Sequence, residues 1–142
     1  MTDMSDILEE QPLGYLMYRV VAVLQPRVTE QLQPLGLTLP EFVCLRLLSM
    51  APGRSNAELA RHTNVSPQAM NNVLRGLQDR GVVRRPATVA SGRALPAELT
   101  ADGTELLKRA ETAVLAAEDD VLDQLNAEQR RDLKRLLAHA VS

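Results

Sequence analysis

Two helix-start signals lie eleven residues apart in the middle of the chain, and they constrain its fold more than any other feature. Ser55 opens a capping box with the glutamate three residues later, which satisfies the free backbone N–H groups of a new helix. Ser66 followed by Pro67 is a second start, because serine is a favoured N-cap and proline costs little in the first turn. Only the short turn Asn64-Val65 separates the two predicted helices. The sequence therefore predicts a helix-turn-helix over residues 55–80.

The rest of the chain reads mainly as helix, with one small hairpin. Apolar residues at three- and four-residue spacing predict helices, whereas short extended runs on either side of a Ser-Gly turn predict strands. The expected elements are helices over 13–35 and 39–50, the two central helices, strands over 82–85 and 94–99, and helices capped by Thr100 and Asn126. We therefore expect a mainly α fold with a β-hairpin wing, in which residues 37–100 form a winged helix-turn-helix and residues 1–36 and 101–142 form N- and C-terminal helices around it.

Charge is distributed unevenly along the chain. Residues 54–93 contain seven arginines and two acidic residues, a net charge of +5, whereas the remainder carries nine basic and sixteen acidic residues, a net charge of −7. A basic middle between acidic ends is typical of a duplex-binding module, although charge alone equally allows a chance cluster on a solvated surface.

The second central helix has a polar face of unusual composition. Its apolar stripe (Met70, Val73, Leu74, Leu77) predicts that the opposite face points outward. That face carries Gln68, Asn71, Asn72 and Arg75, and amides and guanidinium groups make bidentate contacts with adenine and guanine. The alternative is a polar surface helix without a ligand.

Other residues are candidates for contacts with the DNA backbone or the minor groove. Free N–H groups at a helix start bind phosphate, and a thin basic hairpin enters the minor groove. For Arg84 and Arg85 we leave open whether they contact DNA or are solvated while only Arg93 reaches it. With the recognition face, the predicted DNA-binding set is Ser55, Ser66, Gln68, Ala69, Asn71, Asn72, Arg75, Arg84, Arg85, Ser91 and Arg93.

Several classes of protein are excluded by what the sequence lacks. No nucleophile–base pair, carboxylate pair or glycine-rich phosphate loop is visible, so we expect neither enzymatic activity nor a cofactor. Cys44, His62 and His139 are too far apart for a metal site, and Cys44 is expected to be buried and structural. No stretch approaches the ~20 apolar residues that span a bilayer, and the first fifteen residues are acidic rather than basic. The expected location is the cytoplasm, at the nucleoid, without membrane contact.

The terminal helices predict a homodimer. Their apolar stripes are too long for the central module to cover, and soluble monomers rarely leave such patches exposed. Pairing about a two-fold axis would bury them and set two recognition helices about 34 Å apart, one turn of DNA. A monomeric helical bundle is the alternative.

Four fragments, in order, resemble one family. They are Leu-Thr-Leu-Pro-Glu at 37–41, Glu-Leu-Ala at 58–60, Leu-Gln-Asp-Arg-Gly-Val-Val-Arg at 77–84 and Leu-Thr-Ala-Asp-Gly at 99–103. Their order and spacing resemble the MarR family of bacterial winged helix-turn-helix regulators over nearly the whole chain. The resemblance implies a homodimer with a recognition helix at 66–80 and a wing at 82–99. It also implies transcriptional control at a pseudo-palindromic operator in double-stranded DNA. We expect the protein to repress transcription rather than to activate it.

The resemblance has one departure and one further implication. Members of the family often carry an aspartate two residues before the wing-tip arginine, where this chain has Ser91 before Arg93. The resemblance also implies a small aromatic or anionic effector between the dimer helices and the DNA-binding lobe. Its candidate contacts are Tyr15, Tyr18, Arg19 and Arg46, which are otherwise core or interface tyrosines and surface arginines. The competing function is a sequence-tolerant architectural DNA-binding protein of the same fold.

Overall fold

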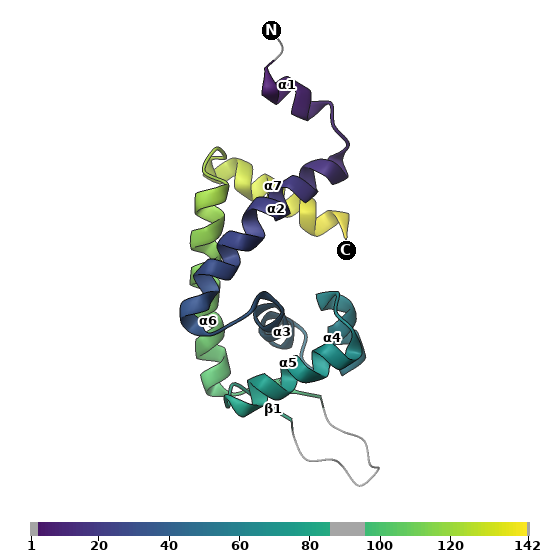
Figure 1. Ribbon diagram of the computed structural model, residues 1–142, viewed down its shortest axis with the longest axis vertical. Coiled ribbons are helices and arrows are strands. Elements are labelled where there is room, and N and C mark those ends of the chain that lie inside the picture. The colour runs from purple at the N-terminus through teal and green to yellow at the C-terminus, as the bar shows by residue number, and fades with distance from the viewer. Residues whose placement is uncertain (1–2, 86–95, 142) are drawn as a thin grey trace.

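The computed structural model describes residues 3–85 and 96–141 (Figure 1). Ser91 and Arg93, predicted at the wing tip, lie outside these residues. Within the described residues, two short strands form one antiparallel pair. In chain order the elements are α1 (Met4–Glu9), α2 (Leu13–Leu32), the 3-10 helix η1 (Gln33–Leu35), α3 (Leu39–Met50), α4 (Asn56–Thr63), α5 (Pro67–Asp79), β1 (Val83–Arg84), β2 (Glu98–Leu99), α6 (Ala101–Val121) and α7 (Ala127–Ala140).

The predicted mainly helical fold with a two-stranded wing is confirmed. Every predicted helix cap forms: each capping side chain accepts a hydrogen bond from the backbone N–H three residues later. The capping residues are Thr38, Ser55, Ser66, Thr100 and Asn126. The described strands are shorter than expected and pair only Val83 with Leu99 and Arg84 with Glu98. Helix α1 was not expected from the sequence. It has neither a side-chain cap nor a buried residue, so it lacks the signals on which sequence interpretation depends.

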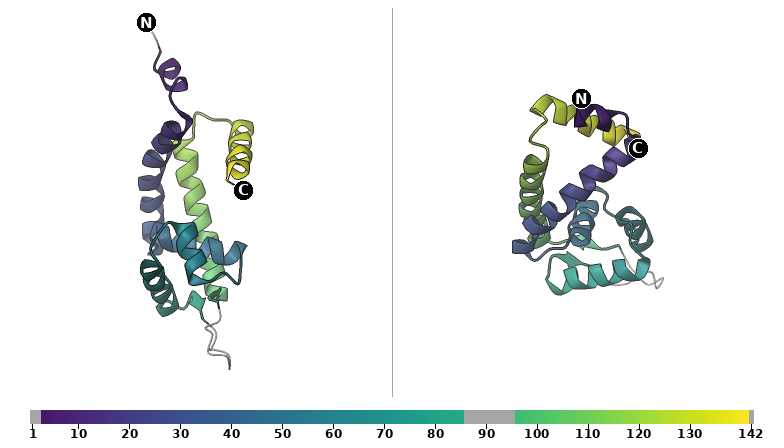
Figure 2. Two further views of the ribbon diagram at one scale, coloured as in Figure 1. Left: turned by 90° about the vertical axis from the view of Figure 1, so that its right-hand side faces the viewer. Right: turned by 45° about the horizontal axis from the view of Figure 1, so that its top comes forward.

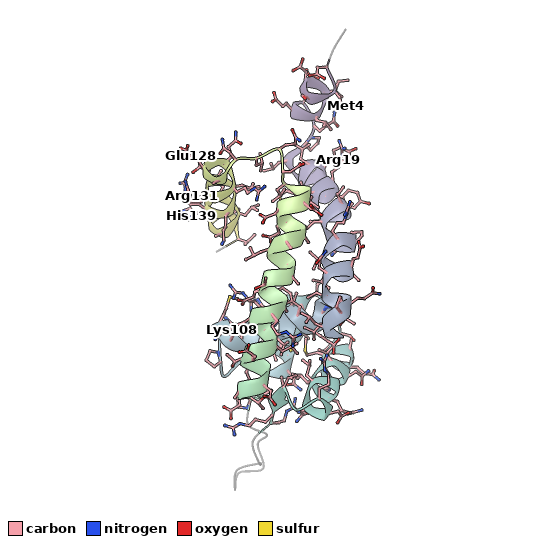
Figure 3. The ribbon with its side chains drawn as sticks, turned by 90° about the vertical axis from the view of Figure 1, so that its left-hand side faces the viewer. Met4, Arg19, Lys108, Glu128, Arg131 and His139 are labelled. Atoms are coloured by element: carbon pink, nitrogen blue, oxygen red, sulfur yellow. The ribbon has the colours of Figure 1, made fainter. Side chains whose placement is uncertain are left out.

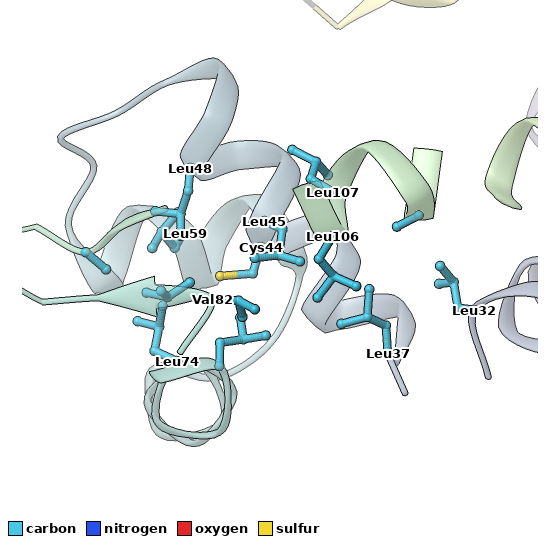
Figure 4. Close-up of a cluster of buried hydrophobic side chains, with 14 of the residues drawn as sticks. Leu32, Leu37, Cys44, Leu45, Leu48, Leu59, Leu74, Val82, Leu106 and Leu107 are labelled. Atoms are coloured by element: carbon cyan, nitrogen blue, oxygen red, sulfur yellow. The ribbon is translucent and has the colours of Figure 1, made fainter. Parts of the chain in front are cut away.

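One apolar core joins the helix-turn-helix to the long helices (Figure 4). Its largest fully buried side chains come from α2, α3, α4 and α5, and among the described residues no polar or charged side chain is buried. These residues are Leu32, Leu45, Leu59, Met70, Leu74, Leu77 and Cys44. The helix-turn-helix therefore rests on a rigid apolar base.

Arg80 ties the C-terminal end of α5 to the link between α2 and α3. Its Nη1 donates to the Gly36 carbonyl oxygen at 2.8 Å and its Nη2 to the Leu35 carbonyl oxygen at 2.9 Å. Gly36 has a φ of 68°, a left-handed conformation that glycine adopts without strain. This double contact fixes the direction of α5 relative to the long helices.

Helices α2 and α6 lie side by side and form a long arm, whereas α7 stands apart from it (Figures 1 and 2). Helix α7 has no buried residue within the chain. Arg130 holds its start against the end of α6, donating to the carbonyl oxygens of Leu122 and Leu125 at 2.9 and 3.1 Å and to Asp119. Leu133 of α7 is half-buried, whereas Leu136 and Leu137 are exposed in the single chain. None of the helices in the described ranges is both long and apolar enough to cross a membrane.

Candidate nucleic-acid interface

The helix-turn-helix has the geometry that its capping residues predict. Ser55 Oγ accepts from the Glu58 backbone N–H at 3.2 Å, and Glu58 Oε1 accepts from the Ser55 backbone N–H at 3.3 Å. These hydrogen bonds lower the pKa of the Glu58 carboxyl, because they stabilise its charged form. Asn64 ends α4 in the left-handed conformation with a φ of 57°, and Ser66 Oγ then accepts from the Ala69 N–H at 3.1 Å to start α5. The turn between the helices is therefore short and hydrogen-bonded at both ends.

Helix α5 has the two faces that its sequence predicts. Met70, Leu74 and Leu77 are at most 1% exposed and pack in the core, and Val73 packs against it. The four polar residues proposed to read DNA are all exposed; they are Gln68, Asn71, Asn72 and Arg75. Ser55 and Ser66 are also exposed at the starts of α4 and α5, whereas Ala69 is half-buried. The face is thus open to a duplex over most of its length.

A chain of hydrogen bonds links three elements behind this face. Arg85, which follows β1, donates from Nη2 to Asn56 Oδ1 at 3.0 Å. Asn56, the first residue of α4, donates from Nδ2 to Asn71 Oδ1 at 2.5 Å. The sequence interpretation did not include Asn56, because its two partners lie 15 and 29 residues away and no local pattern joins them. Arg85 is therefore half-buried and partnered rather than freely solvated.

Arg84 has a different environment from Arg85. Its Nε lies 2.6 Å from Glu98 Oε1, the residue directly opposite on β2, and its side chain remains 70% exposed. An exposed pair of this kind contributes little to stability, so Arg84 can exchange its carboxylate partner for a phosphate at small cost.

The four predicted effector contacts fall into two separate groups. Tyr15, Tyr18 and Arg19 are exposed in the first two turns of α2, next to α1, as the position of Arg19 shows (Figure 3). Arg46 lies on α3 and pairs with Glu111 of α6 at 2.5 Å. A single chain does not bring the two groups together. A hollow of about 560 Å³ lies along the second half of α2 up to the start of α3, and none of the four predicted contacts lines it.

Cys44 is fully buried in α3, as predicted. Burial raises the pKa of its thiol to about 12, and the nearby Glu41 carboxylate adds to this effect. Because the thiolate is the reactive form, the thiol is expected to be inert in the folded protein.

Among residues 3–85 and 96–141 no group of three or more His, Cys, Asp or Glu residues could hold a metal ion.

We predict that native Cys44 resists iodoacetamide at pH 8 and becomes alkylated only when the protein unfolds, which mass spectrometry can follow.

The unfolded Cys44 thiol loses its proton near pH 9, whereas the folded thiol keeps it to about pH 12. The free energy of unfolding should therefore fall as pH rises through this window, by roughly 1.4 kcal/mol per pH unit from this group. The control is Cys44→Ala, whose free energy of unfolding lacks this component. Parallel pH profiles for the two proteins would contradict the prediction.

Comparison with known proteins agrees with this geometry. A sequence model of the MarR family matches residues 35–94. HTH-type transcriptional repressor Rv2887 of Mycobacterium tuberculosis (strain ATCC 25618 / H37Rv) is 63% identical over 131 residues, which cover 92% of this chain and 94% of the relative. The crystal structure of the M. tuberculosis MarR family protein Rv2887 with p-aminosalicylic acid has a TM-score of 0.82 at 61% identity, covering 93% of this chain and 100% of that one. Its complex with DNA has a TM-score of 0.80 at 59% identity, covering 94% and 100%. The chain belongs to the MarR family.

Proposed function

We propose that this protein is a sequence-specific transcriptional repressor that binds a pseudo-palindromic operator in double-stranded DNA as a homodimer. The observation that carries the proposal is the exposed amide-and-arginine face of α5, set on a helix whose opposite side is fixed in the core. A relative that is 63% identical is described as a transcriptional repressor and has been crystallised with DNA. No enzymatic role is proposed.

The contacts with DNA divide between base edges and backbone. Arg75 suits the paired acceptors of guanine, the amides of Gln68 and Asn72 suit adenine, and Asn71 adds a further amide to the same face. Ser55 and Ser66 lie at helix starts, where free N–H groups and the helix dipole favour a phosphate, and Ala69 lies in the first turn of α5, with its own N–H bonded to Ser66 Oγ. Arg84 and the wing residues Ser91 and Arg93 would add contacts beside this helix.

A second copy of this chain is the partner that we propose for the terminal helices. Residues 1–36 and 101–142 would form the dimerisation segments around the DNA-binding domain of residues 37–100. Exposed apolar side chains cluster there on α1, the first half of α2 and α7; the largest are Met4, Ile7, Leu13, Tyr15, Met17, Tyr18, Val20, Val21, Val23, Leu136 and Leu137. A surface this apolar is unusual for a soluble monomer, and pairing across a two-fold axis would cover it.

A small aromatic acid is the effector class that we propose. The relative Rv2887 has been crystallised with salicylic acid and with p-aminosalicylic acid. In this chain Tyr15, Tyr18 and Arg19 offer rings and a cation at one end of α2, and Arg46 lies on α3. We expect p-aminosalicylic acid to release the protein from its operator fragment in a mobility-shift titration. Retention of the complex up to millimolar acid would remove this part of the proposal.

Mobility shifts with genomic fragments, including the region upstream of the protein's own gene, test the main proposal. We expect Arg75→Ala to reduce the ratio between specific and random-sequence affinity about tenfold or more, because a lost bidentate contact with a base removes roughly 1–3 kcal/mol of discrimination. Arg61→Ala is the control, since it removes the same charge from an exposed position on α4. It should weaken binding to all duplexes alike.

The same assay separates the competing architectural role. An architectural protein would bind specific and random duplexes with similar affinity and a steep salt dependence. If wild-type protein shows no preferred fragment, or if Arg61→Ala loses as much discrimination as Arg75→Ala, the assignment of α5 as the reading helix is wrong.

A further inference from the structure

We propose that Asn56 is a positioning residue that decides which end of the Asn71 side-chain amide faces DNA, and that Arg85 imposes this choice. The inference rests on the proposed function, in which α5 reads base edges. It is carried by the hydrogen-bond chain from Arg85 through Asn56 to Asn71, which joins the end of β1 to the starts of α4 and α5.

The direction of this chain follows from the chemistry of its first member. A guanidinium group only donates hydrogen bonds, so Arg85 requires the oxygen of the Asn56 amide on its side. The Asn56 amide then turns its NH₂ group, which only donates, toward Asn71. Asn71 must therefore accept this hydrogen bond with its side-chain oxygen. The Arg85 cation thus orients two side-chain amides, and neither amide can flip without breaking a contact.

The consequence for DNA lies at the free end of Asn71. Its Oδ1 is engaged with Asn56, and among the described residues no acceptor bonds its Nδ2. The exposed Asn71 therefore presents a donor as its unsatisfied group. In the major groove, purine N7, guanine O6 and thymine O4 accept hydrogen bonds, whereas the cytosine edge offers only the N4 donor. Asn71 should favour an acceptor-bearing base and reject cytosine at its position.

The role of Arg85 changes accordingly. The sequence left open whether Arg85 contacts DNA or is solvated. Its contact with Asn56 ties it to the reading face, so changes at Arg85 should alter base preference as well as affinity.

Asn56→Asp should reverse the direction of the hydrogen bond between residues 56 and 71, with almost no change in the shape of the side chain. The aspartate still accepts from Arg85, but its second oxygen also accepts, so Asn71 must turn its NH₂ group inward and its oxygen toward DNA. We expect binding to a library randomised over each half-site to show one position where preference moves from guanine or thymine, which offer only acceptors, to cytosine, whereas adenine, which offers both N7 and the N6 donor, is tolerated by both proteins. The expected change in relative affinity there is about tenfold. Arg85→Ala should relax preference at the same position, and Arg85→Lys, which keeps a donor, should preserve it.

Ala57→Asp is the matched control for charge. It adds the same negative charge one residue along the first turn of α4, at an exposed position. It should weaken binding to every duplex and leave all base preferences unchanged.

Side-chain amide signals in ¹H–¹⁵N spectra of the free protein test the same reversal without DNA. In wild type the hydrogen-bonded NH₂ is that of Asn56, whereas in Asn56→Asp it should become that of Asn71, with a downfield shift and slower exchange. Unchanged Asn71 amide signals in Asn56→Asp would overturn the proposal. So would an unchanged base preference in Asn56→Asp where Asn71→Ala loses it. If wild type itself shows no base preference, the proposed function fails instead, and the spectra still decide the hydrogen-bond chain.

Discussion

Gly103→Ala is expected to lower the free energy of unfolding by about 3 kcal/mol, because the added methyl group has no room. Gly103 lies in the first turn of α6 and packs against the backbone that leads into β1. A Cβ at this position would lie 1.9 Å from the Val82 carbonyl oxygen and 2.9 Å from its carbonyl carbon. These are backbone atoms, so no change of side-chain rotamer relieves the clash.

The contacts around Gly103 mean that a shift of α6 would destabilise the fold. The Val82 carbonyl oxygen accepts from the Thr100 N–H at 3.1 Å, and Thr100 Oγ1 donates to the Gly81 carbonyl oxygen at 2.7 Å. Moving α6 away would stretch both bonds and open the buried contacts of Leu106 and Leu107. The higher helix propensity of alanine, worth up to about 1 kcal/mol, acts in the opposite direction and is too small to compensate.

Urea unfolding followed by circular dichroism measures this effect, at equal protein concentrations because a dimer's stability depends on concentration. Gly76→Ala in the middle of α5 is the control, since a Cβ there meets nothing within 4 Å. It should leave the free energy of unfolding unchanged or raise it slightly. Equal stability of Gly103→Ala and wild type would contradict the close approach of α6 to Val82.

Local signals in the sequence predicted the described helices other than α1. Capping residues such as Ser55 and Ser66 act within one turn, so they can be recognised without tertiary information. The buried stripe of α5 likewise fixed which residues face outward, and the exposure of Asn71 and Arg75 agrees with it. Helix α1 lacked such a signal.

Long-range contacts were beyond the reach of the same reasoning. In the sequence, Asn56 is recognisable only as the first residue of a helix. The packing of α4 against α5 brings it to Asn71. Gly103 similarly reads as an ordinary residue near a cap until α6 is placed over Val82. Both roles depend on segments that meet in three dimensions, where propensity and periodicity carry no information.

Replacing Leu136 and Leu137 of α7 together with asparagine is expected to give monomers and to weaken operator binding about a hundredfold or more. These residues are 59% and 46% exposed in the single chain, and neither belongs to its buried core. In a dimer they would be buried against the second copy. Two linked recognition helices bind far more tightly than one, with gains of about 10²–10⁴, because the second contact is intramolecular.

Light scattering and mobility shifts distinguish this effect from unfolding. The double variant should keep the wild-type far-ultraviolet circular dichroism, scatter as the 15.6 kDa chain, and still bind DNA weakly without preference for paired half-sites. Ala138→Asn is the matched control, because helical periodicity places residue 138 on the face of α7 opposite the leucines. It introduces the same amide and should remain dimeric with full operator affinity. If the double variant stays dimeric, or if it becomes monomeric and retains operator affinity, α7 does not join the two DNA-binding domains.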